Sequence, residues 1–462
     1  MNGLRKENSA FFLFLVLGFL VFFAQTKDFK LLMDGLTYAA LSKNILKTGD
    51  WKTLHYGVEQ YANFYQHPPL AMWIQALVYK VFGFSEAISR YFPSFCALGT
   101  LLCVFSYVKK RYSEAGAFFA ALTLLSSTRY VKWATNFYLD GIFVFFCFAG
   151  FLLWMKNLNA EKKNNFASIA AGILFAFAFM TKGILIFGPL CVVAGSLVLY
   201  RDLKNLKQLL LFLTGAAIPL VLWVAFAGGD IYLDRYFHDS VFTRVGGASG
   251  LSPHPWRNIF LLWWPWWPVF LFTLLKIIPF DREKALFALA ALSFPVGFTF
   301  NGTYMEHYLT PFYPFAAVVV GIQFSKWVPV ISERWMTRMW ILAGVVGVYL
   351  ATVSPSVNQM KETPVREWVN QLEHLPKESK KEIEQIVFTN KSADIWYGMA
   401  NILGKTDWQA IGDFALNRPA TGHSILITSD TETPDSAWQI APCLQVRGFH
   451  FYSSPDLKVC SQ

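Results

Sequence analysis

Apolar stretches close to membrane-spanning length recur from residue 9 to about residue 354 of this 462-residue chain. A soluble domain has no core large enough for so many of them, whereas about 18 or more consecutive apolar residues match the thickness of a bilayer. Hydrophobic residues make up 55% of the chain and charged residues only 15%, against roughly a quarter in average soluble proteins. The sequence therefore predicts an all-α polytopic membrane protein.

The predicted membrane domain, residues 1–354, contains about eleven transmembrane helices. The first follows Arg5 and Lys6 and has no small-residue cleavage site after it, so we expect an uncleaved span rather than a signal peptide. The helices are expected at residues 9–24, 88–108, 115–128, 139–156, 166–180, 183–200, 208–227, 257–279, 283–300, 308–325 and 338–354.

Five short loops between these helices concentrate Lys and Arg, which places the loops and the N-terminus in the cytoplasm. They explain the net charge of +10, so no nucleic-acid partner is expected. The apolar residues 70–83 are too few for a comfortable crossing, and a twelfth crossing there would turn every later basic loop outward. We expect an interfacial helix at 70–83 within a first outer loop of residues 25–87. We also expect the protein to reside in a bacterial inner membrane.

Beyond residue 354 the charge rises, and short strand-like runs occur at 386–389 and 424–428. The sequence therefore predicts a small soluble α/β domain at residues 355–462, on the periplasmic side with the first loop. Cys443 and Cys460 bracket a hairpin-like stretch there, and either a disulfide or two free thiols fits an oxidising compartment. The six cysteines show no metal-ligand spacing, so no cysteine metal site is expected.

Two carboxylates lie where outer segments meet predicted helices, and a carboxylate near hydrocarbon is costly. Asp34 opens a helical stretch that runs to about Lys47, and Asp140 stands where the second outer loop re-enters the membrane. Asp is also a favoured helix N-cap, so a capping role competes with a functional one for both residues.

Cationic side chains are predicted on the same outer face. Lys182 interrupts an apolar run of about 30 residues, and either a snorkelling role at the interface or a functional one fits it. Arg244 and His254 lie in the third outer loop, His67 precedes two prolines, and His307 stands at the outer end of the tenth predicted span. Each could simply be solvated, but together with the carboxylates they indicate a site for an anionic, lipid-linked substrate.

At these residues the sequence resembles the membrane glycosyltransferases that use polyprenyl-phosphate sugars. This superfamily has the GT-C fold and joins the protein O-mannosyltransferases with the aminoarabinose transferase of lipid A. The resemblance covers roughly residues 9–330, and it rests on the order of several motifs along the chain. These are Asp34 with Tyr38 and Ala39, Gly49-Asp50-Trp51, His67-Pro68-Pro69-Leu70, residues 83–90, Tyr138-Leu139-Asp140, Thr181-Lys182-Gly183 and residues 307–314.

The resemblance implies a cavity that opens outward and an acceptor that attacks the sugar's anomeric carbon with inversion. Asp34 would act as general base or orient the acceptor, and Asp140 would share that role or bind acceptor or metal. Arg244 and Lys182, followed by His67 and His254, would stabilise the leaving phosphate, and Tyr38 and His307 are further candidates. Where the family often has Asp-Glu, Asp34 is followed by Gly35, so a role that needs two adjacent carboxylates is in doubt.

Other functions fit the same sequence. A transporter or flippase would move the lipid-linked sugar, although transporters usually show internal repeats and charges at mid-membrane. A binding or assembly protein of the envelope would work through its tail, and a polysaccharide polymerase would differ in its acceptor. The sequence leaves open the sugar, the choice among protein, lipid and glycan acceptors, a divalent metal and the oligomeric state.

Overall fold

The computed structural model describes most of the chain up to residue 328 and short segments beyond it. The described residues are 16–23, 31, 33–55, 58–59, 63–201, 203–242, 250–276, 281–300, 304–328, 334–335, 338–339, 341, 345, 385–389, 409–413, 424–429, 439–440 and 449–453. The chain divides into two compact units. The first comprises residues 1–29, 65–71 and 87–358, and the second comprises residues 30–64, 72–86 and 359–462.

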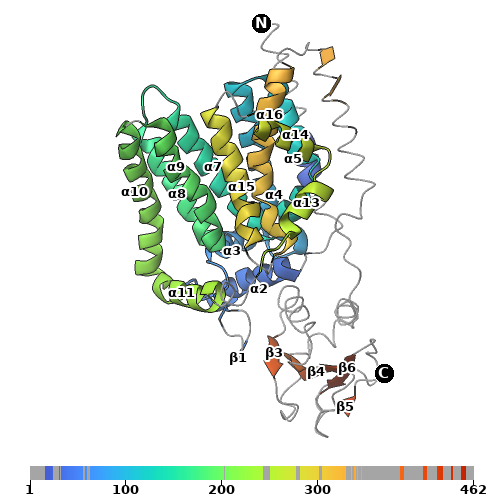
Figure 1. Cartoon of the computed structure of the whole chain (residues 1–462). Helices are drawn as coiled ribbons and strands as arrows, with labels where there is room; N and C mark the ends of the chain where they lie inside the picture. Colours follow the sequence, from blue (N-terminus) through green and yellow to red (C-terminus); the bar gives the residue numbers. More distant parts are fainter. Residues whose placement is uncertain are drawn as a thin grey trace. The chain divides into compact units, whose positions relative to one another are not determined.

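The first unit is a bundle of helices (Figure 1). Its elements are α4 (Glu86–Arg111), α5 (Glu114–Leu125), α6 (Thr128–Thr135), α7 (Leu139–Leu158), α8 (Asn165–Lys182), η2 (Gly183–Ile186), α9 (Phe187–Tyr200), α10 (Leu203–Phe226), α11 (Gly229–Arg235), η3 (Tyr236–Phe242), α13 (His254–Leu262), α14 (Trp266–Leu275), α15 (Arg282–Thr299), η4 (Glu306–Leu309) and α16 (Phe312–Trp327). Side-chain caps mark where several begin: Ser113 caps α5, Asn164 caps α8 and Asp281 caps α15.

Five helical segments of the described residues are long and apolar enough to cross a membrane, or six if one bent pair counts as a span. The chain is therefore a multi-pass membrane protein. The predicted spans from 88–108 to 308–325 fall on helices of the bundle. The count of eleven stays a prediction, because most of 9–24 and of 338–354 lies outside the described residues.

The predicted span at 257–279 is not one straight helix. It is broken into α13 and α14, whose axes are bent by 114°. Pro265 lies in the break, where a ring without an N–H cannot continue the helix. Trp263 at the break is buried and donates its indole N–H to Ser127 Oγ at 2.9 Å, so this tryptophan packs into the bundle.

Helices α8 and α9 form a hairpin beside α7. Asn157 near the end of α7 donates a hydrogen bond from Nδ2 to Oγ of Ser168, at the start of α8, at 2.8 Å. Asn159, just beyond α7, accepts a hydrogen bond from Tyr200 at the end of α9 at 2.8 Å. The start of α8 and the end of α9 therefore share one end of the bundle, and the turn between them lies at the other end, where α7 begins.

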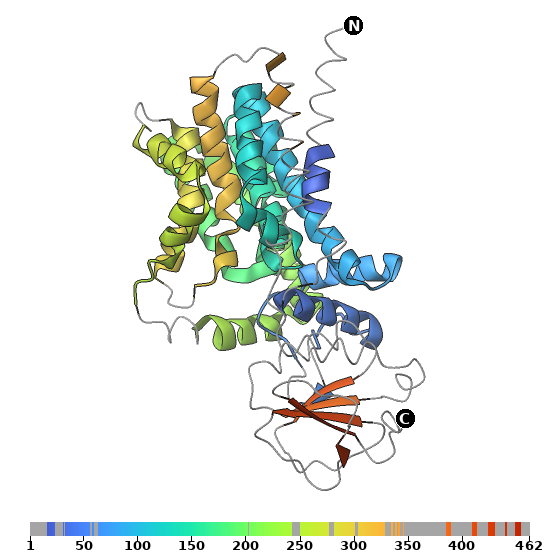
Figure 2. The same ribbon diagram turned by 90° about the vertical axis from the view of Figure 1, so that its right-hand side faces the viewer.

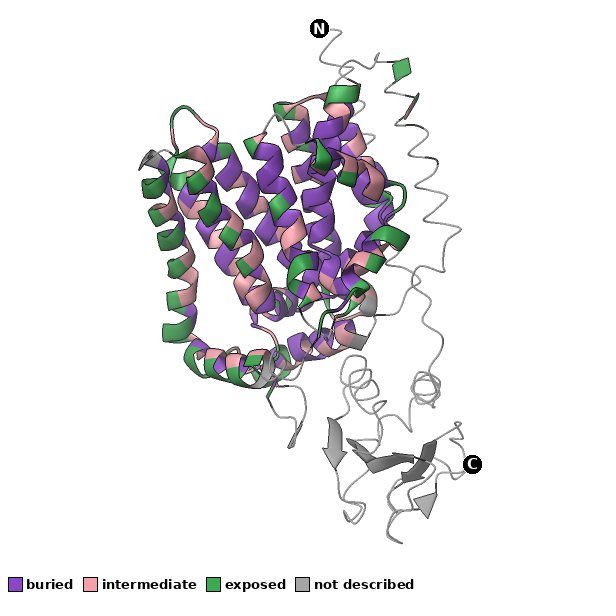
Figure 3. Cartoon of the chain, in the orientation of Figure 1, coloured by how far each residue is buried: buried purple, intermediate pink, exposed green. Residues whose placement is uncertain are grey.

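Burial separates the central helices from the peripheral ones (Figure 3). Helices α7 and α16 are mostly buried, whereas α10 exposes apolar side chains such as Val221 and Leu222. Apolar exposure of this kind suits a helix that faces lipid. Helices α5 and α16 approach closely at two glycines: a Cβ at Gly116 would lie 2.6 Å from the carbonyl oxygen of Gly321. Small residues allow such close packing in membranes.

The second unit contains α2 (Met33–Thr48), most of α3 (Leu70–Phe82) and a six-stranded sheet, whose strands Figure 2 shows together. Strand β1 (Val58–Glu59) pairs in parallel with β3 (Gln409–Asp413), and β3 pairs in parallel with β2 (Gln385–Thr389). Beyond β2 the order continues with β4 (Ser424–Ser429), β6 (Phe449–Ser453) and β5 (Gln439–Ile440). Segments of the predicted first loop thus share a compact unit with the tail, and an independent domain at 355–462 stays a prediction.

The helix expected at 70–83 is present as α3, and its position at the membrane surface stays a prediction. Cys443 and Cys460 both lie outside the described residues, so the alternative of a disulfide or free thiols is not resolved.

Candidate functional site

The predicted residues Asp140 and Lys182 meet as a buried ion pair in the first unit. Asp140 lies in the first turn of α7, and Lys182 is the last residue of α8. Their side chains are 0% and 4% exposed, and the ammonium contacts the carboxylate directly. The proposed capping and snorkelling roles are therefore both wrong: Tyr138 is the N-cap of α7, and Lys182 is buried rather than at a surface. A buried charge pair within a membrane bundle marks a functional site by default.

The turn after Lys182 explains why the motif reads Thr-Lys-Gly. Gly183 ends α8 with a φ of 65°, a conformation that favours glycine. A Cβ on this residue would lie 1.9 Å from the hydroxyl oxygen of Tyr236. That hydroxyl accepts a hydrogen bond from the backbone N–H of Ile184 at 3.1 Å. Glycine therefore lets η3 pack against the turn and fixes where α8 presents its terminal lysine.

His307 and a group of aromatic rings lie beside this ion pair. The ring of His307 is 5.6 Å from that of Trp133 and 5.1 Å from that of Tyr138, the residue before α7. The Lys182 ammonium lies 5.2 Å from the ring centre of Tyr308. His67 and Lys182 are both near enough to His307 to interact with it electrostatically. The structure thus brings together four predicted residues: Asp140, Lys182, His67 and His307.

The proline-rich segment that carries His67 is tied to α11. The hydroxyl of Tyr232 donates a hydrogen bond to the backbone carbonyl of His67, and its ring packs against that of Tyr65 at 5.3 Å. Tyr232 is itself fully buried. The backbone around His67 is therefore held by the bundle.

Two further cations lie on α6 close to these rings. Arg129 forms an ion pair with Glu306 at 2.8 Å, and the Lys132 ammonium lies 4.5 Å from the ring centre of Trp133. Burial and then the charge of Arg129 lower the pKa of Lys132, although Glu306 acts in the opposite direction. Lys132 therefore adds a cation beside these rings, whereas Glu306 balances the charge of Arg129.

Asp34 and Tyr38 belong to the second unit. Both lie on α2, with Asp34 in its first turn, which confirms that this residue opens a helix. The four-residue spacing puts the two side chains on one face of the helix. Tyr38 is buried and packs edge-on against Phe64, with ring centres 6.3 Å apart, whereas Asp34 is half-buried. Asp34 is therefore partly accessible to solvent.

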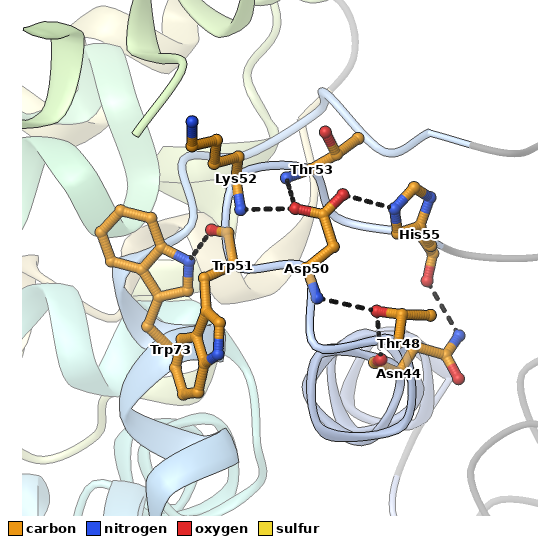
Figure 4. A network of polar contacts seen from close by, with 8 residues as sticks. All are labelled: Asn44, Thr48, Asp50, Trp51, Lys52, Thr53, His55 and Trp73. Atoms are coloured by element: carbon orange, nitrogen blue, oxygen red, sulfur yellow. Dashed lines mark hydrogen bonds and ion pairs between the residues drawn. The ribbon is translucent and has the colours of Figure 1, made fainter. Parts of the chain in front are cut away.

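The Gly-Asp-Trp motif after α2 forms a polar network (Figure 4). Asp50 accepts hydrogen bonds from the backbone N–H groups of Lys52 and Thr53 at 2.8 and 3.1 Å, and its other oxygen lies 2.8 Å from Nε2 of His55. Burial raises the pKa of Asp50, but these partners outweigh it and hold the pKa below its usual value. The aspartate of this motif thus organises the loop.

The remaining candidates differ in what the structure reveals. His254 is exposed at the start of α13, and Arg244 lies outside the described residues. Among the described residues no group of three His, Cys, Asp or Glu side chains could hold a metal ion. The sequence interpretation missed Trp133 and the pairing of Asp140 with Lys182. A signal for the pair was present, because a lone Asp and a lone Lys in neighbouring apolar spans each need a partner.

The chain is similar to known proteins in both sequence and fold. Residues 66–227 match the family described as dolichyl-phosphate-mannose-protein mannosyltransferase, a stretch that contains His67, Asp140 and Lys182. The structure superposes on ArnT from Cupriavidus metallidurans bound to undecaprenyl phosphate, with a TM-score of 0.73, 14% identity and 97% of each chain covered. The chain has the GT-C fold. The resemblance to glycosyltransferases that use polyprenyl-phosphate sugars, predicted from the sequence, is confirmed.

Curated relatives match part of this GT-C chain. An uncharacterized protein of Aquifex aeolicus is 26% identical over 302 residues, which are 63% of this chain and 66% of that protein. The undecaprenyl phosphate-alpha-4-amino-4-deoxy-L-arabinose arabinosyl transferase 2 of Proteus mirabilis is 25% identical over 232 residues, 48% of this chain and 41% of that enzyme. The chain thus spans less than two thirds of the length of these relatives.

Proposed function

We propose that this chain is an inverting glycosyltransferase that takes its sugar from a polyprenyl-phosphate donor. In a single displacement, an acceptor hydroxyl or amine attacks the anomeric carbon, and the bond from that carbon to the phosphate oxygen breaks. The leaving polyprenyl phosphate keeps the electron pair, and the proton of the nucleophile passes to a carboxylate. One displacement at the anomeric carbon inverts its configuration.

The buried ion pair of Asp140 and Lys182 carries this proposal. A leaving phosphate gains negative charge, and a preorganised cation in a water-poor site stabilises that charge far better than one in water. Without substrate, Asp140 neutralises Lys182 and lets the cation stay buried. With donor bound, the phosphate would share Lys182, and Lys132 on α6 would add to the positive field.

Asp34 is the carboxylate proposed to take the proton. It is half-buried at the start of α2, whereas Asp140 is fully buried. A general base must be reachable by the acceptor and ionised, and Asp34 meets the first condition better. Asp140 then has the role of setting the position and charge of Lys182. His67, His254 and Arg244 are proposed as further contacts to the donor phosphate, and Tyr38 and His307 as supports of the site.

The acceptor and the cellular location are inferred from the relatives. The family matched by residues 66–227 is described as a dolichyl-phosphate-mannose-protein mannosyltransferase, and the Proteus mirabilis relative is an arabinosyl transferase named for an undecaprenyl-phosphate-linked sugar. We propose the bacterial inner membrane with catalysis at its periplasmic face, the N-terminus in the cytoplasm and the tail outside. A protein, lipid or glycan acceptor fits this arrangement.

The deciding experiment measures polyprenyl phosphate released from polyprenyl-phosphate sugars by membranes that contain this protein. Several sugar donors and a crude envelope extract as acceptor are supplied, and the wild type is compared with Asp34→Asn. General-base catalysis is worth typically about 10²–10⁴-fold, so the variant should lose activity on that scale. A folded wild-type protein that releases no polyprenyl phosphate from any donor would refute the function and favour a transporter.

A further inference from the structure

A group of cations lies at the end of the bundle that is opposite to the candidate site. Its members are Lys156 in the last turn of α7, Lys162 after that helix, Arg201 at the C-cap of α9 and Lys207 near the start of α10. All four side chains are exposed, and none has a hydrogen bond or ion pair with the described residues. We call these four residues the basic rim. Unlike Lys182, they are available to a partner from outside the chain.

Buried polar side chains hold the helix ends that carry this rim. Gln208 on α10 accepts hydrogen bonds from Asn157 Nδ2 at 3.1 Å and from Ser168 Oγ at 2.8 Å. Its own amide nitrogen donates to Asn165 Oδ1 at 3.0 Å. The neighbouring Lys163 is not part of the rim, because its ammonium donates to backbone carbonyls at the end of α7. The end of α7, the start of α8 and the start of α10 are therefore fixed to one another.

Arg201 has a backbone conformation that favours glycine. Its φ is 44°, in the left-handed region, and among the described residues it is the only one other than glycine with a positive φ. A side chain is strained there, and such strain persists where the surroundings or a function require it. Because the Arg201 side chain has no partner among the described residues, internal contacts do not explain the arginine. An anion from outside the chain would explain it.

Exposed apolar side chains adjoin the rim on α8 and α10. Phe166 in the first turn of α8 is 76% exposed, and Leu206 and Leu210 on α10 are 49% and 58% exposed. The two helices pack closely, since a Cβ at Gly172 would lie 1.9 Å from the backbone oxygen of Phe212. This helix pair therefore has an apolar surface that begins beside the rim.

We propose that the basic rim binds the headgroup of an anionic phospholipid, whose acyl chains lie against the exposed apolar side chains of α8 and α10. The inference goes beyond the proposed function and does not depend on it. Residues 156–163 and 201–207 contain six basic residues and two acidic ones, so their charge complements a phosphate that carries no cation of its own. Basic clusters beside membrane helices attract anionic lipids, and basic pockets between helices bind their headgroups.

The combination of charge and apolar surface distinguishes this partner from two others. A soluble anion would meet the rim alone and would gain nothing from the apolar side chains. A zwitterionic phospholipid has the same acyl chains, but the cation of its headgroup would face lysine and arginine. An anionic phospholipid complements both features in one molecule. Lysines that only mark an interface contact whatever lipid surrounds them, so a preference for anionic lipid is the property to measure.

The test measures lipid binding to the full-length protein purified in mild detergent. Native mass spectrometry follows phosphatidylglycerol, phosphatidylcholine with the same acyl chains, and glycerol phosphate as a headgroup without chains. The wild type is compared with Arg201→Gly/Lys207→Gln, which removes two charges of the rim and relieves the strained φ. The matched control is Lys80→Gln, because Lys80 on α3 is also exposed and is followed by the exposed apolar residues Val81 and Phe82. The melting temperature of each lipid-free protein is recorded.

We expect the wild type to bind phosphatidylglycerol about tenfold or more tightly than either phosphatidylcholine or glycerol phosphate, since each cation near an anionic lipid strengthens binding severalfold. The variant Arg201→Gly/Lys207→Gln should lose most of this preference without a lower melting temperature, whereas Lys80→Gln should keep it. Lys156→Gln/Lys162→Gln removes the other two charges of the rim and should have the same effect, which keeps the test decisive if the first variant does not fold.

Three results would overturn the inference. Equal affinity for the two phospholipids would show that the rim contacts membrane lipid in general. Equal affinity for glycerol phosphate and phosphatidylglycerol would show a site for a soluble anion. Folded rim variants with the wild-type preference would show that these cations do not hold the lipid. Because no sugar donor enters the experiment, each of these results leaves the proposed function intact.

Discussion

Removal of one or both charges of the buried pair separates its contribution to stability from its contribution to catalysis. Lys182→Met leaves the fully buried carboxylate of Asp140 without its cation. Loss of one partner of a buried pair typically costs about 3–5 kcal/mol, because the other charge stays in a medium that solvates it poorly. The double variant Asp140→Val/Lys182→Met removes both charges and should recover most of that stability, because apolar replacement of a buried pair is often neutral or stabilising.

Catalysis should respond differently from stability. If Lys182 stabilises the leaving phosphate, both Lys182→Met and the double variant lose about 10²–10³-fold in kcat, the usual effect of one electrostatic contact to a transition state. Lys182→Arg keeps the charge and should keep part of the activity. The double variant is therefore the informative protein, since it is stable but lacks the cation.

The assay measures thermal unfolding in detergent and polyprenyl phosphate release on the same preparations. Release is compared only between variants whose unfolding midpoints lie above the assay temperature. A double variant that is stable and fully active would show that the pair only holds α7 to α8, and it would refute the catalytic role. A double variant no more stable than Lys182→Met would refute the reasoning on buried charge.

Three other regions give predictions of their own. Gly183→Ala should destabilise the protein by about 1–3 kcal/mol or more, because the new Cβ would clash with Tyr236 and alanine is strained at the positive φ of this position. An unchanged unfolding midpoint would contradict this prediction. Glu283→Gln should cost about 1–3 kcal/mol of stability while leaving KM for the donor unchanged. The reason is that Glu283 is buried and accepts a hydrogen bond from Arg111 at 3.1 Å. A raised KM would count against a purely structural role. The lowered pKa of Asp50 means that its contribution to stability is present above its unfolded pKa of 3.8 and is lost as the pH falls through the folded value. The gap in unfolding midpoint between wild type and Asp50→Asn should therefore shrink from pH 6 to pH 3, and a constant gap would show that the charge does not matter.

Part of the candidate site follows from local sequence alone. An Asp or Lys in an apolar run stands out because burial of its charge is costly. Asp140, Lys182 and His307 could therefore be identified singly, and the structure places them together at one end of the bundle. Trp133 could not be identified, because an aromatic residue in a helix is common and nothing in its neighbours marks it as part of a site.

The sequence by itself indicated approximately where most described helices of the first unit lie, because hydrophobic length is a property of consecutive residues. Only the tertiary structure decided that Lys182 pairs with Asp140, since that contact depends on the turn at Gly183 and on how α8 returns beside α7. The same holds for the 114° break between α13 and α14. Such features depend on packing between segments far apart in the chain. The pattern of residues within one segment does not indicate which other segments will pack against it.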